Sequence, residues 1–201
     1  VGIMLSVFQQ AVGINAVLYY APRIFQDMGM GNPMVQTVIM GVVNISFTLV
    51  AVFTVEKLGR KPLLILGSIG TAVGALGVAL TFGNAALSTV TMISIMVYSA
   101  SFMFSWGPIA WVLIAELFPN TIRGAAVAIA VAFQWIFNFI VSSTFVPMFN
   151  MHLTPGDDFG HWFTYGLYGV ICILAAIFVW KLVPETKGKT LEDMSKLWRK
   201  E

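Results

Sequence analysis

Long apolar runs are the feature that most limits what this chain can fold into. Six of them follow one another, and each is about the length that a helix needs to cross a bilayer core. They cover residues 1–26, 34–55, 62–83, 88–115, 124–148 and 162–182. Because 58% of the residues are hydrophobic and only 10% are charged, too few polar residues remain to cover a soluble surface. We therefore expect a polytopic membrane protein.

Helices fit these runs better than barrel strands. The runs are continuous rather than alternating, and in lipid a helix satisfies its backbone polar groups within its own segment. The predicted fold class is all-α, with a six-helix transmembrane bundle over residues 1–183 and a cytoplasmic tail over 184–201. After Thr190, apolar residues recur in the tail at helical spacing, which predicts an amphipathic helix on the membrane surface. A frayed polar terminus is the alternative.

The basic residues predict the orientation in the membrane. When the joints are assigned to alternate sides, Arg23 lies alone on one side, and the other ten of the eleven basic residues lie on the opposite side. Short cytoplasmic loops are rich in Lys and Arg. The second, fourth and sixth spans are therefore expected to end in the cytoplasm, with the C-terminus on that side of a cell inner (plasma) membrane.

Several classes of function are disfavoured. The net charge of +2 gives no reason to expect a nucleic-acid partner, and the single Cys172 forms no intrachain disulfide. No Asp, Glu, Lys or His lies in the middle of a span, so the usual groups for catalysis, metal binding or an internal proton relay are missing. We expect no enzyme activity, no cofactor and no metal. Outside the membrane, His152, Asp157, Asp158 and His161 read as a solvated loop.

Neutral polar side chains inside the spans are the candidate binding groups. An amide both donates and accepts hydrogen bonds, which suits a sugar hydroxyl, and a tryptophan face stacks on the apolar face of a sugar ring. A charged substrate would need a counter-charge. The alternatives are that amides join helices and that aromatic residues sit at the membrane interface. The set comprises Gln9, Gln10, Asn15, Tyr19, Tyr20, Asn44, Trp106, Trp111, Gln134, Trp135 and Asn138.

Two spans carry polar interruptions that disturb a helix. Residues 9–15 interrupt the first span, with Gly13 among the amides, and Ser105–Pro108 interrupts the fourth. These spans open two consecutive sets of three. Transporters built from inverted three-helix repeats place broken helices in corresponding positions around a site near the membrane midplane. A structural kink at Pro108 without a functional role is the alternative.

The predicted cytoplasmic ends of the spans also repeat a pattern. Glu56 precedes Arg60, and Glu116 precedes Arg123, each pair at a helix boundary. Such residues can form ion pairs when the cytoplasmic side is closed and separate when it opens. The alternative is that the basic residues only set the topology.

Five motifs, in this order, resemble those of the sugar porter family of the major facilitator superfamily. They are Gln9–Asn15 with Tyr19–Tyr20, Gly59–Lys61, Trp106–Trp111, Glu116–Gly124 and Pro184–Gly188. The resemblance implies the C-terminal six-helix half of that fold. It also implies a substrate site comprising Gln9, Gln10, Asn15, Tyr19, Asn44, Gly107, Trp111, Gln134 and Trp135. The implied cytoplasmic charge network comprises Glu56, Arg60, Glu116, Arg123 and Glu185.

The function that the resemblance implies is transport of a monosaccharide by alternating access. D-xylose or a related pentose or hexose is the expected substrate, with protons as the coupled ion in the full-length protein. The alternatives are uncoupled facilitated diffusion and a non-transporting sugar sensor. Because the chain begins at Val1 inside an apolar stretch, we expect it to be part of a longer protein whose N-terminal six-helix half is missing here.

Overall fold

The structure, a computed structural model, describes residues 1–27, 29, 32–154 and 158–188. The described residues form helices joined by short turns and contain no strand. The helices are α1 (Gly2–Ala11), α2 (Ile14–Asp27), α3 (Pro33–Leu58), α4 (Arg60–Thr81), the short 3₁₀ helix η1 (Ala85–Leu87), α5 (Ser88–Phe104), α6 (Trp106–Glu116), α7 (Arg123–Phe149) and α8 (Phe159–Leu182).

These helices make six segments that are long and apolar enough to cross a membrane. Four of the segments contain one helix each. The other two are α1 with α2, and η1 with α5 and α6. The all-helical architecture with six candidate spans is therefore the one that the apolar runs predict.

The break between α1 and α2 lies at Val12 and Gly13. Gly13 has φ +87°, a left-handed conformation that disfavours any residue with a Cβ. The break releases the Val12 carbonyl from the helical ladder, and the buried Tyr98 hydroxyl of α5 donates a hydrogen bond to it. A polar backbone group is thus satisfied deep inside the bundle, where leaving it unpaired costs several kcal/mol.

The break between α5 and α6 lies at Ser105, three residues before a proline. Pro108 has no backbone N–H, and its ring would clash with the carbonyl of Phe104 in a continuous helix. Phe104 is the last residue of α5, so the helix ends where this clash begins. Pro108 then occupies the first turn of α6, a position that tolerates proline. The proline therefore separates two helices instead of kinking one.

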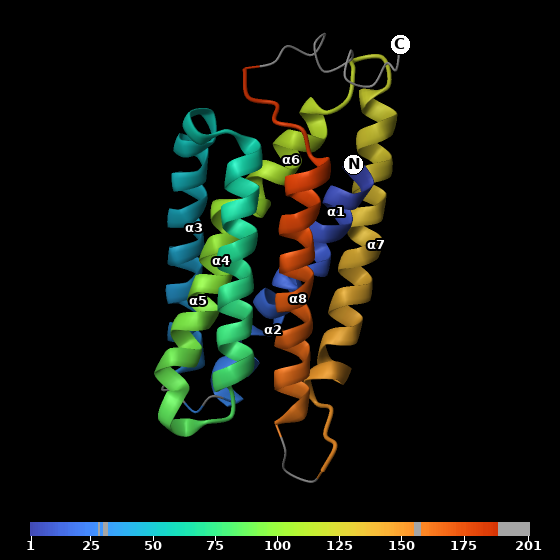
Figure 1. The fold of residues 1–201 in the computed structure, drawn as a ribbon. Coiled ribbons are helices and arrows are strands. Elements are labelled where there is room, and N and C mark those ends of the chain that lie inside the picture. The colour runs from blue at the N-terminus through green and yellow to red at the C-terminus, as the bar shows by residue number, and fades with distance from the viewer. Residues whose placement is uncertain (28, 30–31, 155–157, 189–201) are drawn as a thin grey trace.

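The helix α4 packs extensively against both α5 and α8, and in Figure 1 it stands among α3, α5 and α8. Small residues allow this close packing. A Cβ added at Gly67 would overlap Ser105 at the break. A Cβ added at Gly70 or Gly74 would overlap Ser101 or Tyr98 of α5, respectively. Helix pairs in membranes commonly use such small residues because backbones can then approach closely. This tight contact fixes the position of the α5–α6 break.

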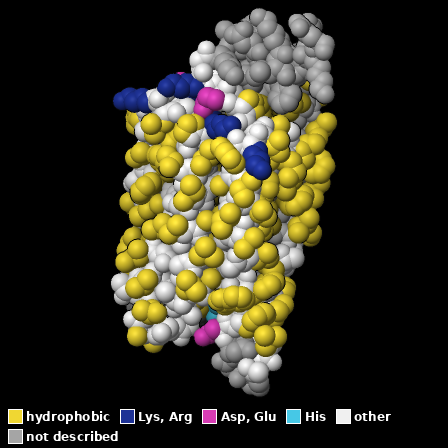
Figure 2. Space-filling view, viewed as in Figure 1, with side chains coloured by type: hydrophobic (Ala, Val, Ile, Leu, Met, Phe, Trp, Pro, Cys, Tyr) yellow, Lys and Arg dark blue, Asp and Glu magenta, His cyan; other side chains and the backbone are white. Residues whose placement is uncertain are grey.

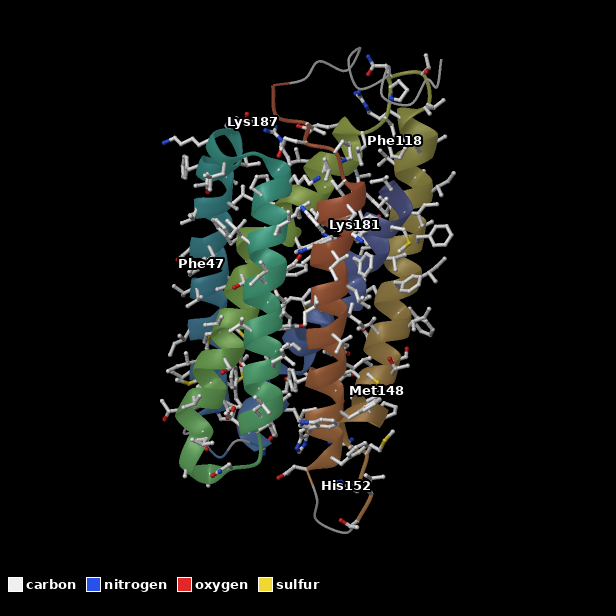
Figure 3. All side chains as sticks on the ribbon, viewed as in Figure 1. Phe47, Phe118, Met148, His152, Lys181 and Lys187 are labelled. Atoms are coloured by element: carbon white, nitrogen blue, oxygen red, sulfur yellow. The ribbon has the colours of Figure 1, made fainter. Side chains whose placement is uncertain are left out.

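Polar and apolar surfaces are separated along the bundle. Its sides are apolar, and Phe53 of α3 and Phe139 of α7 are 74% and 73% exposed. In Figure 2, Lys and Arg gather toward one end together with an acidic side chain, and a further acidic side chain lies at the opposite end beside a histidine. Figure 3 places Lys187 and Phe118 toward the end with the basic side chains and His152 at the opposite one. This distribution is typical of a protein whose sides face lipid and whose ends face water.

One expected joint is shorter than the sequence suggested. Residues 56–61 were expected to form a loop, but α3 continues to Leu58 and α4 begins at Arg60. Gly59 alone makes the turn, with φ +92°. Charged residues at helix ends can reach water without unwinding the helix, which explains why the charges did not mark its end. The amphipathic helix expected in the tail lies outside the described residues.

Gly13 should be intolerant of any side chain. Gly13→Ala places a Cβ on a backbone with positive φ and against the Tyr168 ring, so we expect a loss of about 1–3 kcal/mol in stability. Gly41→Ala is the control, because Gly41 lies inside α3 with no atom near the added Cβ. Thermal unfolding in detergent measures both changes. An unchanged melting temperature for Gly13→Ala would contradict the assigned break.

Candidate functional site

A cavity of about 320 Å³ lies where the two broken segments meet α7. Its volume is within the range of about 300–1,000 Å³ that is usual for small-molecule sites. Amide and aromatic side chains predominate in its lining, and no carboxylate or basic group is among them. The lining residues are Gln9, Gln10, Asn15, Tyr19, Phe102, Met103, Gly107, Trp111, Gln134 and Trp135.

Gln9 connects the two helix breaks. Its side-chain Nε2 donates to the carbonyl oxygen of Trp106 at 3.0 Å, so a residue of α1 bonds to the first residue of α6. Trp106 is fully buried, and its indole Nε1 donates to Ser68 Oγ of α4 at 2.7 Å. Gln9 Oε1 is buried without a hydrogen-bond partner. The side chain therefore anchors the site through its nitrogen and keeps an acceptor available.

Gln10 is held by two other amides. Its Oε1 accepts from Asn15 Nδ2 at 2.7 Å and from Asn138 Nδ2 at 2.9 Å. Asn15 follows the break on α2, whereas Asn138 lies on α7. The fixed orientation of Gln10 thus depends on three helices, and both lone pairs of its oxygen are engaged. Any ligand bond to Gln10 must use its NH₂ group.

Three exposed aromatic side chains border the cavity. Tyr19 is 58% exposed, Trp111 43% and Trp135 62%. Between them, Gly107 places no side chain on the wall, so the backbone of α6 borders the space directly. Gln134 Oε1 is a second buried acceptor without a hydrogen-bond partner. The cavity thus offers flat apolar faces beside amide acceptors and donors, which suits a neutral ligand with many hydroxyl groups.

Eight of the nine predicted substrate-site residues line this cavity, and Asn44 does not. The Asn44 side chain lies between α3 and α5, where its Oδ1 accepts from Ser99 Oγ at 2.7 Å. In this conformation it joins two helices. Two lining residues, Phe102 and Met103, were not predicted. Both lie in the last turn of α5, directly before the break at Ser105, and their closeness to the predicted interruption is the signal from which they could have been predicted.

Four residues of the predicted charge network meet at the polar end of the bundle. Arg60 Nη2 contacts Glu56 Oε1 at 2.8 Å and Glu116 Oε1 at 2.9 Å. The Arg60 side chain is only 9% exposed, so these contacts compensate for a largely desolvated charge. We refer to Glu56, Arg60, Glu116 and Glu185 as the charge cluster. Through it, the ends of α3, α4 and α6 are joined.

Glu185 caps the beginning of α4 from a distant part of the sequence. Its Oε1 accepts from the backbone N–H of Arg60 and its Oε2 from that of Lys61, each at 3.0 Å. These N–H groups have no partner within the helix, and the positive end of the helix dipole favours a carboxylate there. The residue next to this cap must be glycine, because a Cβ at Gly59 would overlap the Glu185 carboxylate.

Arg123 does not join the charge cluster. Its Nε and Nη2 both donate to the carbonyl oxygen of Phe118 at 3.2 Å. The guanidinium therefore closes the joint between α6 and α7 instead of pairing with a carboxylate of the described residues. The sequence pattern of Glu before Arg was the same at both boundaries, but only the first Arg is brought within reach of acidic side chains.

Broken membrane helices around a neutral polar cavity, with charges confined to the ends, are an arrangement typical of membrane transporters. The comparison with known families agrees. Residues 1–198 match the family described as "Sugar (and other) transporter". The chain belongs to this family.

Curated relatives are similar over the whole chain. It is 50% identical over 203 residues to the D-xylose-proton symporter of Escherichia coli, covering 100% of this chain and 41% of that protein. It is 40% identical to the arabinose-proton symporter of Bacillus subtilis, covering 100% and 42%, and 40% identical to the glucose facilitated diffusion protein of Zymomonas mobilis, covering 98% and 42%. The chain thus spans about two fifths of these relatives.

Solved structures of the Escherichia coli symporter are also similar. The complex with 6-bromo-6-deoxy-D-glucose gives a TM-score of 0.87 at 49% identity, covering 98% of this chain and 42% of that one. The inward-open conformation gives a TM-score of 0.84 at 49% identity, covering 98% and 41%. The fold is therefore that of the major facilitator superfamily. These shares do not say which half of a relative is matched, so the expected C-terminal position stays a prediction.

Proposed function

We propose that this chain forms one half of a carrier that moves a monosaccharide across the cell inner membrane by alternating access. D-xylose or a related pentose or hexose is the proposed substrate, and the 50% identity to the D-xylose-proton symporter supports this choice. The single observation that carries the proposal is the cavity at the two helix breaks, because its walls supply amides and aromatic faces and no fixed charge.

Each wall has a proposed role in binding. The free NH₂ of Gln10 donates to a sugar hydroxyl, while the unpaired Oε1 atoms of Gln9 and Gln134 accept from hydroxyls. Trp111 stacks on the apolar face of the ring. Asn15, Tyr19, Gly107 and Trp135 complete the lining, and Asn44 contributes only if its bond to Ser99 opens. A neutral ligand would then supply the hydrogen bonds that these buried groups lack.

A second six-helix bundle completes the proposed carrier. Alternating access requires two bundles that rock around a shared site. The share of about 41% of the symporter's length supports such a division. We place this bundle as the C-terminal one on the basis of its motifs, from Gln9–Gln10 through to Pro184–Gly188, and we place the C-terminus in the cytoplasm on the basis of the basic residues at that end.

Proton coupling is part of the proposal, although the cavity has no group that would carry the proton. Two of the relatives named above are proton symporters. In the lining described here the amides are neutral at all physiological pH values, so the coupling carboxylate belongs to the other bundle. Facilitated diffusion is the second candidate, because the Zymomonas mobilis relative is named for that activity.

The charge cluster is proposed to stabilise the state that is closed to the cytoplasm. Arg60 joins the ends of three helices through Glu56 and Glu116, and Glu185 ties the segment after α8 to the same place. Two Arg60 atoms, Nε and Nη1, are buried without a partner. Since such a group favours a further acceptor, the cluster is suited to contacts with the second bundle that form and break during transport.

A pair of chimeras tests both the function and the position in the fold. In one, this chain replaces the second half of the Escherichia coli D-xylose-proton symporter, and in the other it replaces the first half. We expect D-xylose uptake, with alkalinisation of the medium, in cells that lack their own transporter and carry the first chimera only. Uptake by the second chimera alone would overturn the C-terminal placement, and uptake by neither would overturn the proposed function.

Gln134→Met tests the site within the active chimera. The substitution removes a buried acceptor that has no hydrogen-bond partner, so folding stability should be unchanged or slightly raised. Sugar affinity should fall by about 1–3 kcal/mol, because a ligand hydroxyl loses its partner. Equilibrium binding and thermal unfolding separate the two effects.

Gln26→Met is the matched control for this substitution. Gln26 lies near the end of α2 with an exposed side chain, outside the cavity lining. It should leave both affinity and stability unchanged. Equal affinities of the Gln134→Met variant and the unaltered chimera would remove Gln134 from the binding site.

A further inference from the structure

A fully buried tyrosine, Tyr98 of α5, reaches the break between α1 and α2 from outside the cavity. Its side chain is 0% exposed and is not among the residues that line the cavity. Its hydroxyl donates a hydrogen bond to the carbonyl oxygen of Val12, which lies directly before Gly13. A solute in the cavity therefore does not contact this hydroxyl, and any influence of Tyr98 on binding must pass through the break.

Close packing fixes the position of Tyr98. A Cβ at Gly74 of α4 would overlap the Tyr98 backbone, so α4 and α5 are in close contact at this turn. The next residue, Ser99, donates from its hydroxyl to Asn44 Oδ1 of α3 at 2.7 Å. Because two neighbouring helices hold α5 here, the Tyr98 hydroxyl is a donor with a fixed place in the bundle.

The Val12 carbonyl has two alternative partners. In a continuous helix it would accept from the backbone N–H of Ala16, four residues further on. In the structure it accepts from Tyr98 instead, and Gly13 takes a left-handed backbone with φ +87°. An unpaired carbonyl inside a membrane is costly. The broken conformation therefore depends on a donor from another segment, and Tyr98 supplies it.

The break also brings Asn15 to Gln10. Asn15 Nδ2 donates to Gln10 Oε1 at 2.7 Å, although the two residues are five positions apart. In a continuous helix, residues five apart point about 140° away from each other and do not share a face. This bond and the one from Asn138 at 2.9 Å together direct the NH₂ group of Gln10. Without the break, Gln10 would lose one of its two partners.

We propose that Tyr98 is a positioning residue for sugar binding, which acts on Gln10 through the break between α1 and α2. Its hydroxyl favours the broken backbone over a continuous helix, the break brings Asn15 to Gln10, and Gln10 then presents its NH₂ to the solute. The inference rests on the proposed function, in which Gln10 donates to a sugar hydroxyl. It adds a residue that determines affinity without contacting the ligand.

Tyr98→Phe removes the hydroxyl and keeps the ring. In the active chimera we expect it to weaken D-xylose binding about tenfold, which is the effect of losing one hydrogen bond to the ligand. Tyr165→Phe is the matched control, because Tyr165 is also 0% exposed and its hydroxyl has no hydrogen-bond partner. It removes the same atom from the interior and should change the affinity by less than about twofold. Equilibrium binding measures both affinities, and thermal unfolding shows whether both variants are folded.

A double-substitution cycle with Gly13→Ala separates positioning from general destabilisation. Alanine avoids a positive φ but fits a continuous helix, so Gly13→Ala disfavours the break while Tyr98 is intact. It should also lower the affinity about tenfold. Once the helix is continuous, a second substitution that disfavours the break has nothing further to change, so the combined variant should lose no more than about tenfold. Losses that multiply to about 100-fold would show that the two residues act separately.

Unchanged D-xylose affinity in a folded Tyr98→Phe variant would overturn the proposal, as would an equal loss in Tyr165→Phe. A Tyr98→Phe chain that does not fold would also overturn it, because Tyr98 would then serve the fold rather than the site. Failure of both unaltered chimeras to bind D-xylose would instead overturn the proposed function, and this inference with it. The binding of D-xylose before any substitution therefore distinguishes the two failures.

Discussion

Unpaired polar groups are very costly inside a membrane, and this constraint governs the structure around the two helix breaks. Breaking α1 from α2 at Gly13 exposes the Val12 carbonyl, and the Tyr98 hydroxyl from another segment satisfies it. Gln9 then bonds to the Trp106 carbonyl at the second break. Each break therefore depends on the other segment for its hydrogen bonds, which fixes the two broken segments side by side.

The same constraint shapes the binding cavity. Amides that do not bond to a ligand must bond to one another, and Gln10, Asn15 and Asn138 do so across three helices. This network orients the donors of the cavity before any ligand arrives. Two acceptors in the cavity, on Gln9 and Gln134, are left without a hydrogen-bond partner. A ligand hydroxyl can donate to them, which favours binding. Charged side chains stay at the ends of the bundle, where water or other charges compensate for them.

The sequence was sufficient to predict much of this arrangement. Apolar runs predicted the six segments because the bilayer sets their length, and Gly13 and Pro108 predicted the breaks because their backbone chemistry is local. Other features depend on tertiary packing and could not be predicted. The bond between Asn44 and Ser99 and the cap that Glu185 provides for α4 each join residues far apart in the sequence.

The central claim is that a neutral amide cavity at the helix breaks holds a neutral, hydroxyl-rich solute. Competition for labelled D-xylose binding to the active chimera tests it most directly, with D-xylose and its carboxylate analogue D-xylonate as competitors. Because the lining has no cationic group to compensate for a carboxylate, D-xylonate should bind roughly 100-fold more weakly or not at all. Equal competition by the two compounds would contradict the account.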